Sequence, residues 1–341
     1  MEPVRFGLVG YGFGGRYFHA PLLAAASECA FLGVVTTSEE RRALLGREHP
    51  AAAAFGSLEE LAAAGAEAVA ISTPADTHSA LTDAALDLGL AVVCDKPFAL
   101  DAAAARASVE RAERSGLVLA PYQNRRWDSD FRTVRALVDR GALGTVTRFE
   151  SRFERFTPDP GPAPAGGGTL LDFGAHLVDQ ALVLLGPVDT VYAQWRIRES
   201  GLDDDVLVAL THRSGARSLL AGSWSEGAPG WRFRVSGTAG SYVVDGPMDV
   251  QESLLLAGKS PAGLGEAWGT EPEDRWGRLR RGDAGEAVPT ERGRWDTFYP
   301  AFAAAVRGAG AVPVDPRDAV ASLTVLDAAR RSAQEGIVVR L

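Results

Sequence analysis

Near the start of the sequence, Val4-Arg5-Phe6-Gly7-Leu8-Val9 runs directly into Gly10-Tyr11-Gly12-Phe13-Gly14-Gly15. An apolar run followed by glycines with this spacing is typical of the turn between a strand and a helix in dinucleotide-binding folds. The first glycine allows a tight turn, the second lets the backbone approach a pyrophosphate, and the third lets the helix pack closely. Unpaired N–H groups at the helix start would face the phosphates. The stretch therefore predicts a dinucleotide site that contains Gly10, Gly12, Phe13, Gly14 and Gly15.

Short apolar strands alternate with helical patterns over the first ~120 residues, which is typical of a parallel sheet covered on both faces. The predicted strands are Val4–Val9, Phe31–Val35, Ala68–Ser72, Ala91–Cys94 and Leu117–Pro121. The predicted helices lie near Tyr17–Ala26, Glu39–Arg47, Leu58–Ala63, Thr77–Leu88 and Ala102–Ser115, with Gly116 as a helix stop. We expect an α/β chain in which residues 1–121 form a doubly wound Rossmann domain that binds ligands at the carboxyl ends of its strands.

The pattern changes after Arg126, and residues 122–341 are expected to form a second, α+β domain for substrate binding and oligomerisation. The predicted helices of this domain are Ser129–Arg140, about Leu170–Leu185, Phe298–Arg307 and Pro316–Gln334, and its strands are Thr145–Arg155, Thr190–Arg198, Val206–His212, Ser218–Ser223, Trp231–Ser236 and Ser241–Val244. Strands in such succession favour a mostly antiparallel sheet that is open on one face. The polar stretch Gly258–Arg294 is predicted to be a loop.

Composition narrows the class of protein. A chain of 341 residues, 46% hydrophobic and 23% charged, can form two globular domains. Its net charge of −9 argues against nucleic acid or an anionic membrane as the main partner. Two cysteines in apolar surroundings do not favour a disulfide framework or a zinc site. The start lacks the features of a signal peptide, and a cytoplasmic protein is expected.

The end of the second predicted strand bears on the choice of dinucleotide. A carboxylate there would bind the ribose 2′-OH of NAD and repel the 2′-phosphate of NADP. The chain instead reads Val35-Thr36-Thr37-Ser38-Glu39-Glu40-Arg41-Arg42. We expect NADP, bound by Thr37, Ser38 and one of the two arginines, with Arg42 placed in the predicted site. In the alternative, Glu39 caps the helix, the arginines are solvated, and the cofactor is NAD.

Lysine is rare in this chain, since only Lys96 and Lys259 are lysines among 35 basic residues. A position that keeps lysine against this bias suggests a need for a compact ammonium group. Lys96 follows an apolar strand in Val92-Val93-Cys94-Asp95-Lys96-Pro97, whereas Lys259 lies in a polar stretch and is expected to be a solvated loop residue. The alternative for Lys96 is an ordinary charge at a strand end.

Asp172 and His176 stand four residues apart on a predicted helix that follows Gly166-Gly167-Gly168, so their side chains share one face. Histidine suits the proton transfer that accompanies oxidation of an alcohol, and a neighbouring lysine can stabilise the developing alkoxide. The alternatives are a helix-terminal acid beside a structural histidine, or a metal site with Asp179 that lacks a third ligand. His19, His49, His78 and His212 are interpreted as structural, although His78 could line the cofactor crevice.

These residues resemble the glucose–fructose oxidoreductase/inositol dehydrogenase (Gfo/Idh/MocA) family over the whole chain. The likeness rests on the glycine turn, Ser72-Thr73-Pro74 with His78, Asp95-Lys96-Pro97 and Asp172-Phe173-Gly174-Ala175-His176. The resemblance implies a Rossmann domain, an open sheet that mediates a homodimer or homotetramer, and Lys96, Asp172 and His176 as the catalytic set. It also implies a cofactor site that includes Thr73, Pro74, His78, Asp95 and Lys96.

Two further runs, Phe18–Leu22 and Asn124–Phe131, resemble NADP-dependent scyllo-inositol dehydrogenases. The chain departs from them in its short Pro/Gly loop between Phe156 and Thr169, where the related sequences carry a longer, charged segment. We expect an NAD(P)-dependent oxidoreductase that acts on a secondary hydroxyl or ketone of a cyclic polyol or sugar. Asn124 and Arg126 are candidate substrate contacts, with a domain-interface salt bridge as the alternative for Arg126. The rival functions are an NAD-dependent glycosidase and a non-catalytic dinucleotide sensor.

Overall fold

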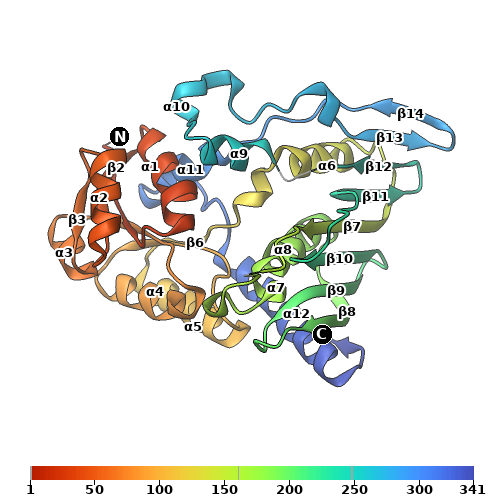
Figure 1. Ribbon diagram of the computed structural model, residues 1–341, viewed down its shortest axis with the longest axis horizontal. Coiled ribbons are helices and arrows are strands. Elements are labelled where there is room, and N and C mark those ends of the chain that lie inside the picture. The colour runs from red at the N-terminus through yellow and green to blue at the C-terminus, as the bar shows by residue number, and fades with distance from the viewer. Residues whose placement is uncertain (1, 160, 247–248) are drawn as a thin grey trace. The chain divides into compact units, whose positions relative to one another are not determined.

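The computed structural model describes residues 2–159, 161–246 and 249–341 (Figure 1). The chain folds into two compact units. The first unit combines the residues up to Gln123 with Glu252–Trp268 and Trp295–Val320. The second unit combines Asn124–Gln251, Gly269–Arg294 and Ala321–Leu341. Each unit is therefore built from three separate segments of the sequence.

The first unit contains a six-stranded sheet of order β3-β2-β1-β4-β5-β6, in which every neighbouring pair is parallel. Its strands are β1 (Val4–Val9), β2 (Cys29–Val35), β3 (Ala53–Phe55), β4 (Ala68–Ile71), β5 (Ala91–Cys94) and β6 (Leu119–Pro121). This is the strand order of dinucleotide-binding folds, and it places the carboxyl ends of β1 and β4 side by side. The predicted doubly wound sheet is confirmed.

Helices α1 (Ala20–Ala25), α2 (Glu39–Glu48), α3 (Leu58–Ala63), α4 (His78–Asp87) and α5 (Ala102–Ser115) connect these strands. The side chains of Ser38, Ser57 and Asp101 cap α2, α3 and α5, because each accepts a hydrogen bond from a backbone N–H three residues on. Gly116 ends α5 at φ +65°, as predicted. The predicted helix Tyr17–Ala26 instead begins as a π-helix at Gly15–His19 and continues as α1.

Segments from late in the sequence complete the first unit. They include most of α9 (Val250–Leu256), α10 (Pro261–Leu264), α11 (Phe298–Val306) and the start of α12 (Pro316–Glu335). Phe6 of β1 packs edge-on against Tyr299 and Phe302 of α11, with ring centroids 5.4 and 5.7 Å apart. These aromatic pairs explain why α11 belongs to the first unit.

The second unit contains a nine-stranded sheet of order β14-β13-β12-β11-β7-β10-β9-β8-β15. Its strands are β7 (Val146–Glu154), β8 (Val188–Ile197), β9 (Asp203–His212), β10 (Arg217–Ser223), β11 (Phe233–Gly237), β12 (Gly240–Val244), β13 (Arg278–Arg281), β14 (Ala284–Ala287) and β15 (Val339–Arg340). Its neighbouring strands pair antiparallel, apart from the parallel pair β7–β10.

Helices α7 (Thr169–Asp172) and α8 (Gly174–Leu185) cover one face of this sheet, against β7, β9 and β10. Along β9, Val206, Val208 and Leu210 are buried whereas Leu207 is 47% exposed. This alternation confirms the predicted sheet with one open face. Helix α6 (Ser129–Asp139) belongs to the same unit.

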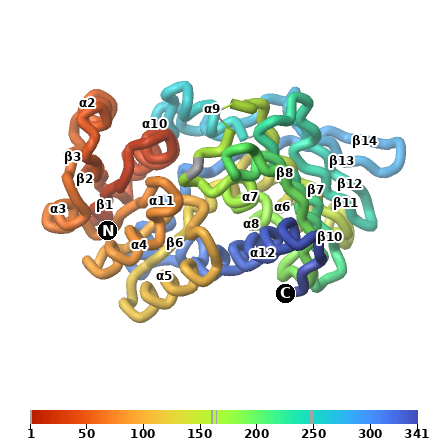
Figure 2. Tube along the Cα trace, turned by 60° about the horizontal axis from the view of Figure 1, so that its bottom comes forward, coloured from red at the N-terminus to blue at the C-terminus, as the bar shows by residue number. Residues whose placement is uncertain are grey.

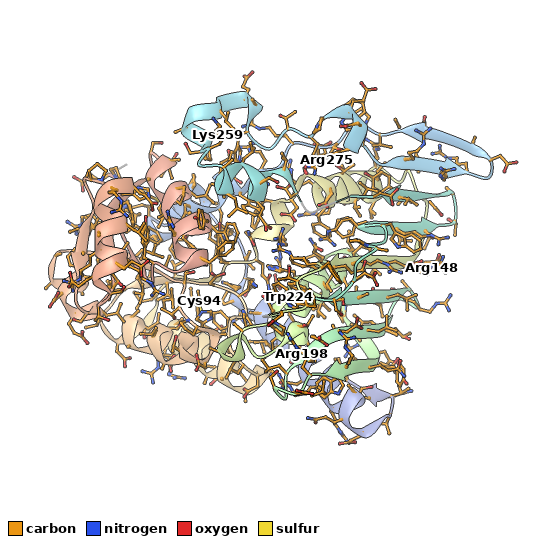
Figure 3. All side chains as sticks on the ribbon, in the orientation of Figure 1. Cys94, Arg148, Arg198, Trp224, Lys259 and Arg275 are labelled. Atoms are coloured by element: carbon orange, nitrogen blue, oxygen red, sulfur yellow. The ribbon has the colours of Figure 1, made fainter. Side chains whose placement is uncertain are left out.

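The prediction of a loop over Gly258–Arg294 is wrong in part. The stretch contains α10 and the β13–β14 hairpin, which extends the edge of the sheet beyond β12 (Figure 2). Arg278–Arg281 lacks the alternating apolar residues that predict a strand. It forms a strand because its backbone pairs with β12. Lys259 is exposed between α9 and α10, as predicted (Figure 3). Among the described residues, no helix has the length and hydropathy needed to cross a membrane.

Candidate functional site

The glycine turn after β1 has the geometry that a dinucleotide requires. Gly10 has φ +93°, and a Cβ atom there would lie 2.3 Å from the carbonyl oxygen of Ser72. A Cβ atom at Gly15 would lie 2.2 Å from the carbonyl oxygen of Gly10. At Gly12, by contrast, a Cβ atom would meet Arg41 Nη2 at 3.8 Å, so the backbone there is open to a ligand. The turn fits the pyrophosphate of a dinucleotide.

The end of β2 separates the two candidate arginines. The Arg42 side chain on α2 turns back towards the residue that follows β2, donating from Nε to the Thr36 carbonyl oxygen at 3.1 Å and lying 3.8 Å from Glu39. Ser38 Oγ caps α2 by accepting from the Arg41 N–H. The guanidinium of Arg41 instead lies beside Gly12. Of the two arginines, Arg41 is the one placed next to the glycine turn.

The turn after β5 holds Asp95 and Lys96. One carboxylate oxygen of Asp95 accepts a hydrogen bond from Ser72 Oγ at 2.8 Å and lies 3.1 Å from His19 Nε2. The other oxygen accepts from the Lys96 N–H at 2.8 Å. A Cβ atom at Gly14 would lie 3.0 Å from this carboxylate, so Asp95 also lies against the glycine turn. The half-buried Lys96 thus follows a carboxylate fixed from three sides.

The charge of Asp95 is set by its neighbours. Burial alone would raise its pKa, but electrostatic interactions with His19, Lys96 and His78 hold the pKa below its ordinary value. His19 is itself fully buried, and its Nδ1 lies 2.5 Å from the Tyr299 hydroxyl. The sequence interpretation of His19 as structural did not reveal this link to Asp95. The run Phe18–Leu22, noted for its resemblance, was the available signal.

Thr73, Pro74 and His78 follow β4. The Thr73 and Thr77 hydroxyls lie 2.6 Å apart, and Thr77 donates to the Pro74 carbonyl oxygen. The His78 ring is buried at 1% exposure, with its nitrogens facing the carbonyl oxygens of Thr73 and Pro97. The buried His78 ring therefore links the turn that follows β4 to the turn that follows β5.

In the second unit, the predicted helix Leu170–Leu185 divides at Phe173 into α7 and α8. Phe173 keeps helical angles, φ −81° and ψ −37°, so the path from half-buried Asp172 to buried His176 remains helical. The start of α7 is tightly packed, because a Cβ atom at Gly168 would lie 2.1 Å from Asp203 Oδ1. The Asp203 carboxylate accepts from the Leu170 N–H at 2.5 Å. The glycine run before this helix thus allows the close approach that the sequence predicted.

An aromatic stack accompanies the helical segment that carries Asp172 and His176. Phe173, between Asp172 and His176, stacks on Phe153 of β7 with centroids 4.0 Å apart and on Trp224 with centroids 4.9 Å apart. Phe153 and Trp224 were not predicted, because residues from different strands show no shared pattern in the sequence. The stack fixes the segment that joins the two proposed catalytic residues.

Arg126 forms an ion pair inside the second unit. Its guanidinium donates two hydrogen bonds to the Asp179 carboxylate, at 2.8 and 2.6 Å, and both side chains are largely buried. Asp179 lies one turn beyond His176 on α8. This ion pair lies within one unit, since both partners belong to the second unit. Asn124 is buried two residues earlier.

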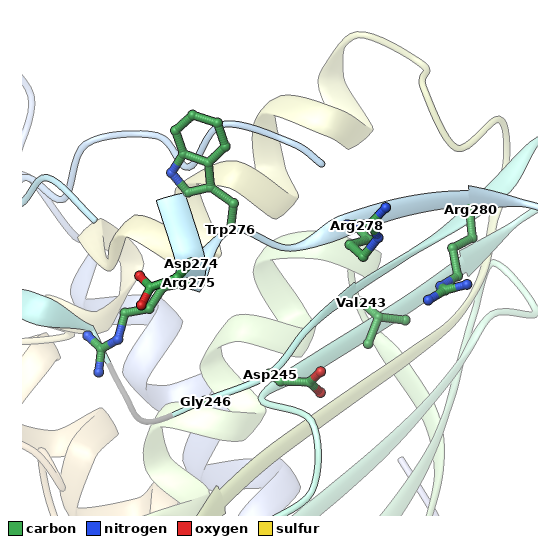
Figure 4. A pocket seen from close by; sticks show the side chains of 8 residues that line it. All are labelled: Val243, Asp245, Gly246, Asp274, Arg275, Trp276, Arg278 and Arg280. Carbon is green, nitrogen blue, oxygen red and sulfur yellow. The ribbon is translucent and has the colours of Figure 1, made fainter. Parts of the chain in front are cut away.

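Two other observations bear on ligands, a hollow in the second unit and the grouping of possible metal ligands. The side chains of Arg275, Arg278 and Arg280 line a hollow of about 260 Å³ together with those of Asp245 and Asp274 (Figure 4). Charges of both signs line it, so its composition does not select an anion. Within residues 2–159, 161–246 and 249–341, no three or more His, Cys, Asp or Glu side chains are grouped to hold a metal ion.

Comparison with known proteins agrees with this geometry. Residues 4–123 match the family model described as an oxidoreductase family with an NAD-binding Rossmann fold. Residues 131–243 match the GFO/IDH/MocA C-terminal domain. The chain belongs to the Gfo/Idh/MocA oxidoreductase family.

Relatives of this oxidoreductase extend over its whole length. The uncharacterized oxidoreductase YdgJ of Escherichia coli K12 is 34% identical over 98% of this chain and 97% of its own length. The scyllo-inositol 2-dehydrogenase (NADP(+)) IolW of Bacillus subtilis is 30% identical over 98% of this chain and 95% of its own. A crystal structure of an oxidoreductase from Bacillus cereus, 26% identical, superposes with a TM-score of 0.88 over 99% of this chain and 98% of its own.

Proposed function

We propose that this oxidoreductase transfers hydride between NADP and a secondary hydroxyl or ketone of a cyclic polyol or sugar. The observation that carries the proposal is the Asp95–Lys96 turn, held by Ser72 and His19 against the glycine turn. The 30% identical relative IolW, named as an NADP-dependent scyllo-inositol dehydrogenase, supports this substrate class. D-apiose dehydrogenase of Paraburkholderia graminis, 31% identical over 85% of this chain, supports sugars as well.

Each catalytic residue has a proposed task. NADP, when bound, supplies the acceptor or donor of the hydride. His176 takes the proton from the substrate hydroxyl, or returns it, since imidazole titrates near neutral pH. Lys96 donates a hydrogen bond to the same oxygen and stabilises its negative charge as it develops. Asp172 orients the substrate by accepting hydrogen bonds from its hydroxyls.

The proposed choice of NADP rests on the end of β2. Thr36, Thr37 and Ser38 stand where an NAD-specific site would carry a carboxylate. Arg41, beside Gly12, supplies a guanidinium suited to a phosphate. We therefore assign the 2′-phosphate contact to Arg41, with Thr37 and Ser38 as the hydroxyl partners. Arg126, paired with Asp179, is proposed to position α8 rather than to contact substrate.

We also propose that copies of the chain associate through the open face of the nine-stranded sheet. Leu207 and Leu219 are 47% and 39% exposed on that face, and Tyr192 is 36% exposed. Register places all three on one side, since Leu219 and Tyr192 both pair with Ala209, two residues from Leu207. Light scattering of the purified protein would give the number of copies.

The experiment that tests the function follows reduced-cofactor absorbance at steady state, with NADP⁺ or NAD⁺ and a panel of inositols and aldoses. Turnover that prefers NADP⁺ supports the proposal. Release of sugar from a glycoside without net reduction of cofactor would replace it with the glycosidase function. Binding of NADP⁺ with no turnover of any polyol or sugar would reject the substrate class.

A further inference from the structure

His78 presents a question of charge. It is the first residue of α4, and its ring is 1% exposed. Nδ1 lies 2.7 Å from the carbonyl oxygen of Pro97, and Nε2 lies 2.9 Å from the carbonyl oxygen of Thr73. A carbonyl oxygen can only accept a hydrogen bond, and a neutral imidazole can donate only one. Both interactions are favourable together only if both ring nitrogens carry a proton.

His212 in the second unit provides a matched contrast. Its ring is also 1% exposed, and its Nδ1 lies 2.8 Å from the carbonyl oxygen of Gly186. Its Nε2, however, lies 2.7 Å from the hydroxyl of Ser218. A hydroxyl can donate, so the neutral tautomer with a proton on Nδ1 satisfies both partners. Burial lowers the pKa of His212 accordingly.

The surroundings of His78 favour the charged ring. Cys94 of β5 and Asp95 of the following turn are the titratable groups that act on it, and Asp95 also interacts with Lys96 and His19. Burial alone would lower the pKa of His78. Cys94, Asp95 and the Pro97 carbonyl outweigh burial and raise the pKa to about 9. This direction agrees with the two carbonyl contacts, which are favourable together only when both ring nitrogens carry a proton.

We propose that His78 is a positioning residue, held as a buried imidazolium that ties the Thr73 carbonyl after β4 to the Pro97 carbonyl after Lys96. The link fixes the backbone on both sides of the crevice edge where Lys96 stands. The effect of this link on turnover rests on the proposed catalytic role of Lys96. The charge of the His78 ring can be tested independently of that role. Deprotonation would leave a nitrogen lone pair facing a carbonyl oxygen, which would loosen the turn that carries Lys96.

The charge can be measured without any activity. Nitrogen NMR of ¹⁵N-histidine-labelled protein distinguishes imidazolium from each neutral tautomer, and the chain has only five histidines to assign. At pH 7 we expect the His78 ring to show two protonated nitrogens and the His212 ring to show one. Assignment uses His78→Gln and His212→Gln, or through-bond correlation in the unsubstituted protein if either variant fails to fold. A neutral His78 ring at pH 7 would overturn the proposal.

The positioning role is tested by a pH profile of kcat and KM with the best substrate. We expect His78→Gln to lower kcat roughly 10–100-fold through misplacement of Lys96, and to abolish any decline of kcat near pH 9 that the unsubstituted enzyme shows. The matched control, His212→Gln, is expected to keep the shape of the profile. A decline that persists unchanged in His78→Gln would overturn the link to Lys96. If the enzyme turns over no substrate, the NMR result still decides the charge, so the two failures are distinguishable.

Discussion

Asp95 in the first unit and Asp249 in the second are both largely buried carboxylates, yet the protein shifts their pKa values in opposite directions. His19, Lys96 and His78 hold the pKa of Asp95 below its ordinary value, against the effect of burial. Burial, together with the neighbouring charge of Asp130, raises the pKa of Asp249 to about 6. The charges of the groups around each buried carboxylate therefore decide the direction in which its pKa shifts.

The second unit gathers carboxylates around fewer cations. Asp128 lies 3.2 Å from Arg125, and Asp130 lies 3.5 Å from Arg232, while Asp249 accepts from the Ser129 N–H at 2.5 Å. Burial raises the pKa values of Asp128 and Asp130 as well. The first unit thus keeps a carboxylate ionised beside the proposed cofactor site, whereas this cluster in the second unit ties α6 to its surroundings. The proposed proton transfer belongs to His176, outside both of these carboxylate sites.

The division of tasks is tested most strongly at His176. His176→Asn keeps a polar side chain that cannot exchange a proton near neutral pH. We expect kcat to fall by ~10²–10⁴-fold, the usual contribution of a general acid or base. Steady-state kinetics with the best substrate would measure this loss. Asp249→Asn serves as the control and is expected to leave kcat at pH 7 unchanged. A loss below about tenfold at His176 would remove its assigned role.

Substitution of Arg41 tests the proposed NADP site of the first unit. Arg41→Ala removes the guanidinium beside Gly12 and should weaken NADP⁺ binding by roughly tenfold or more, the value of a charge-assisted hydrogen bond. Binding of NAD⁺ should change little, since it lacks the 2′-phosphate. The matched variant Arg42→Ala should affect NADP⁺ binding less, because Arg42 donates to the Thr36 carbonyl oxygen after β2. Fluorescence titration of both cofactors measures these affinities, and equal effects of the two variants would refute the assignment.

Asp249 tests the buried cluster through stability. Its folded-state pKa of about 6 lies above the ordinary value of 3.8. Stability from the proton on Asp249 is therefore fully present below pH 3.8 and is lost as the pH rises through about 6. Asp249→Asn cannot lose that proton. Relative to the unsubstituted protein, the variant should gain on the order of 2 kcal/mol between pH 4 and pH 7.

Denaturant unfolding of both proteins across this pH range provides the measurement. The loss of one acceptor oxygen shifts the whole curve of the variant, but it does not change the slope with pH. Parallel curves for the two proteins would show that Asp249 is ionised throughout the range. The comparison with Asp95 would then fail.

Local patterns were enough to predict most of the first unit. Leu58–Ala63, Ala91–Cys94 and Ala102–Ser115 have the predicted bounds, because apolar runs, caps and a terminal glycine mark them within the sequence. The β13–β14 hairpin could not be predicted in this way. Arg278–Arg281 is charged and becomes a strand only by pairing with β12, so the information lies in the partner.

The site shows the same limit. Residues such as Gly10, Asp95 and Lys96 lie at the strand ends where the sequence placed them, because turns and strands are local features. Partners that arise from distant segments were missed: His19 meets a tyrosine 280 positions away in the sequence, and Arg126 pairs with a residue 53 positions away. Such pairs depend on tertiary packing, for which a single sequence carries no periodic signal.

Glu67 in the first unit provides a contrast to Asp249, and its substitution has the smallest expected effect on stability. It accepts hydrogen bonds from Arg307 at 2.7 and 3.0 Å, and these hydrogen bonds lower its pKa from 4.5 to about 2. The sign is opposite to that of Asp249: stability from this ion pair is present above pH 4.5 and is lost as the pH falls through about 2. Because water partly screens the pair, Glu67→Gln should cost only about 1 kcal/mol at pH 7.

The difference in unfolding free energy between Glu67→Gln and the unsubstituted protein should shrink as the pH falls below 4.5, because Glu67 takes up a proton and loses its ion pair. The difference for Asp249→Asn should also shrink towards pH 4, because Asp249 then carries its proton in the folded protein. High salt should reduce the Glu67 effect and leave the buried Asp249 effect nearly intact, since salt screens exposed charges far more than buried ones. A Glu67→Gln effect that is independent of both pH and salt would contradict this prediction. It would mean that the variant is destabilised by lost packing rather than by loss of the charge interaction with Arg307.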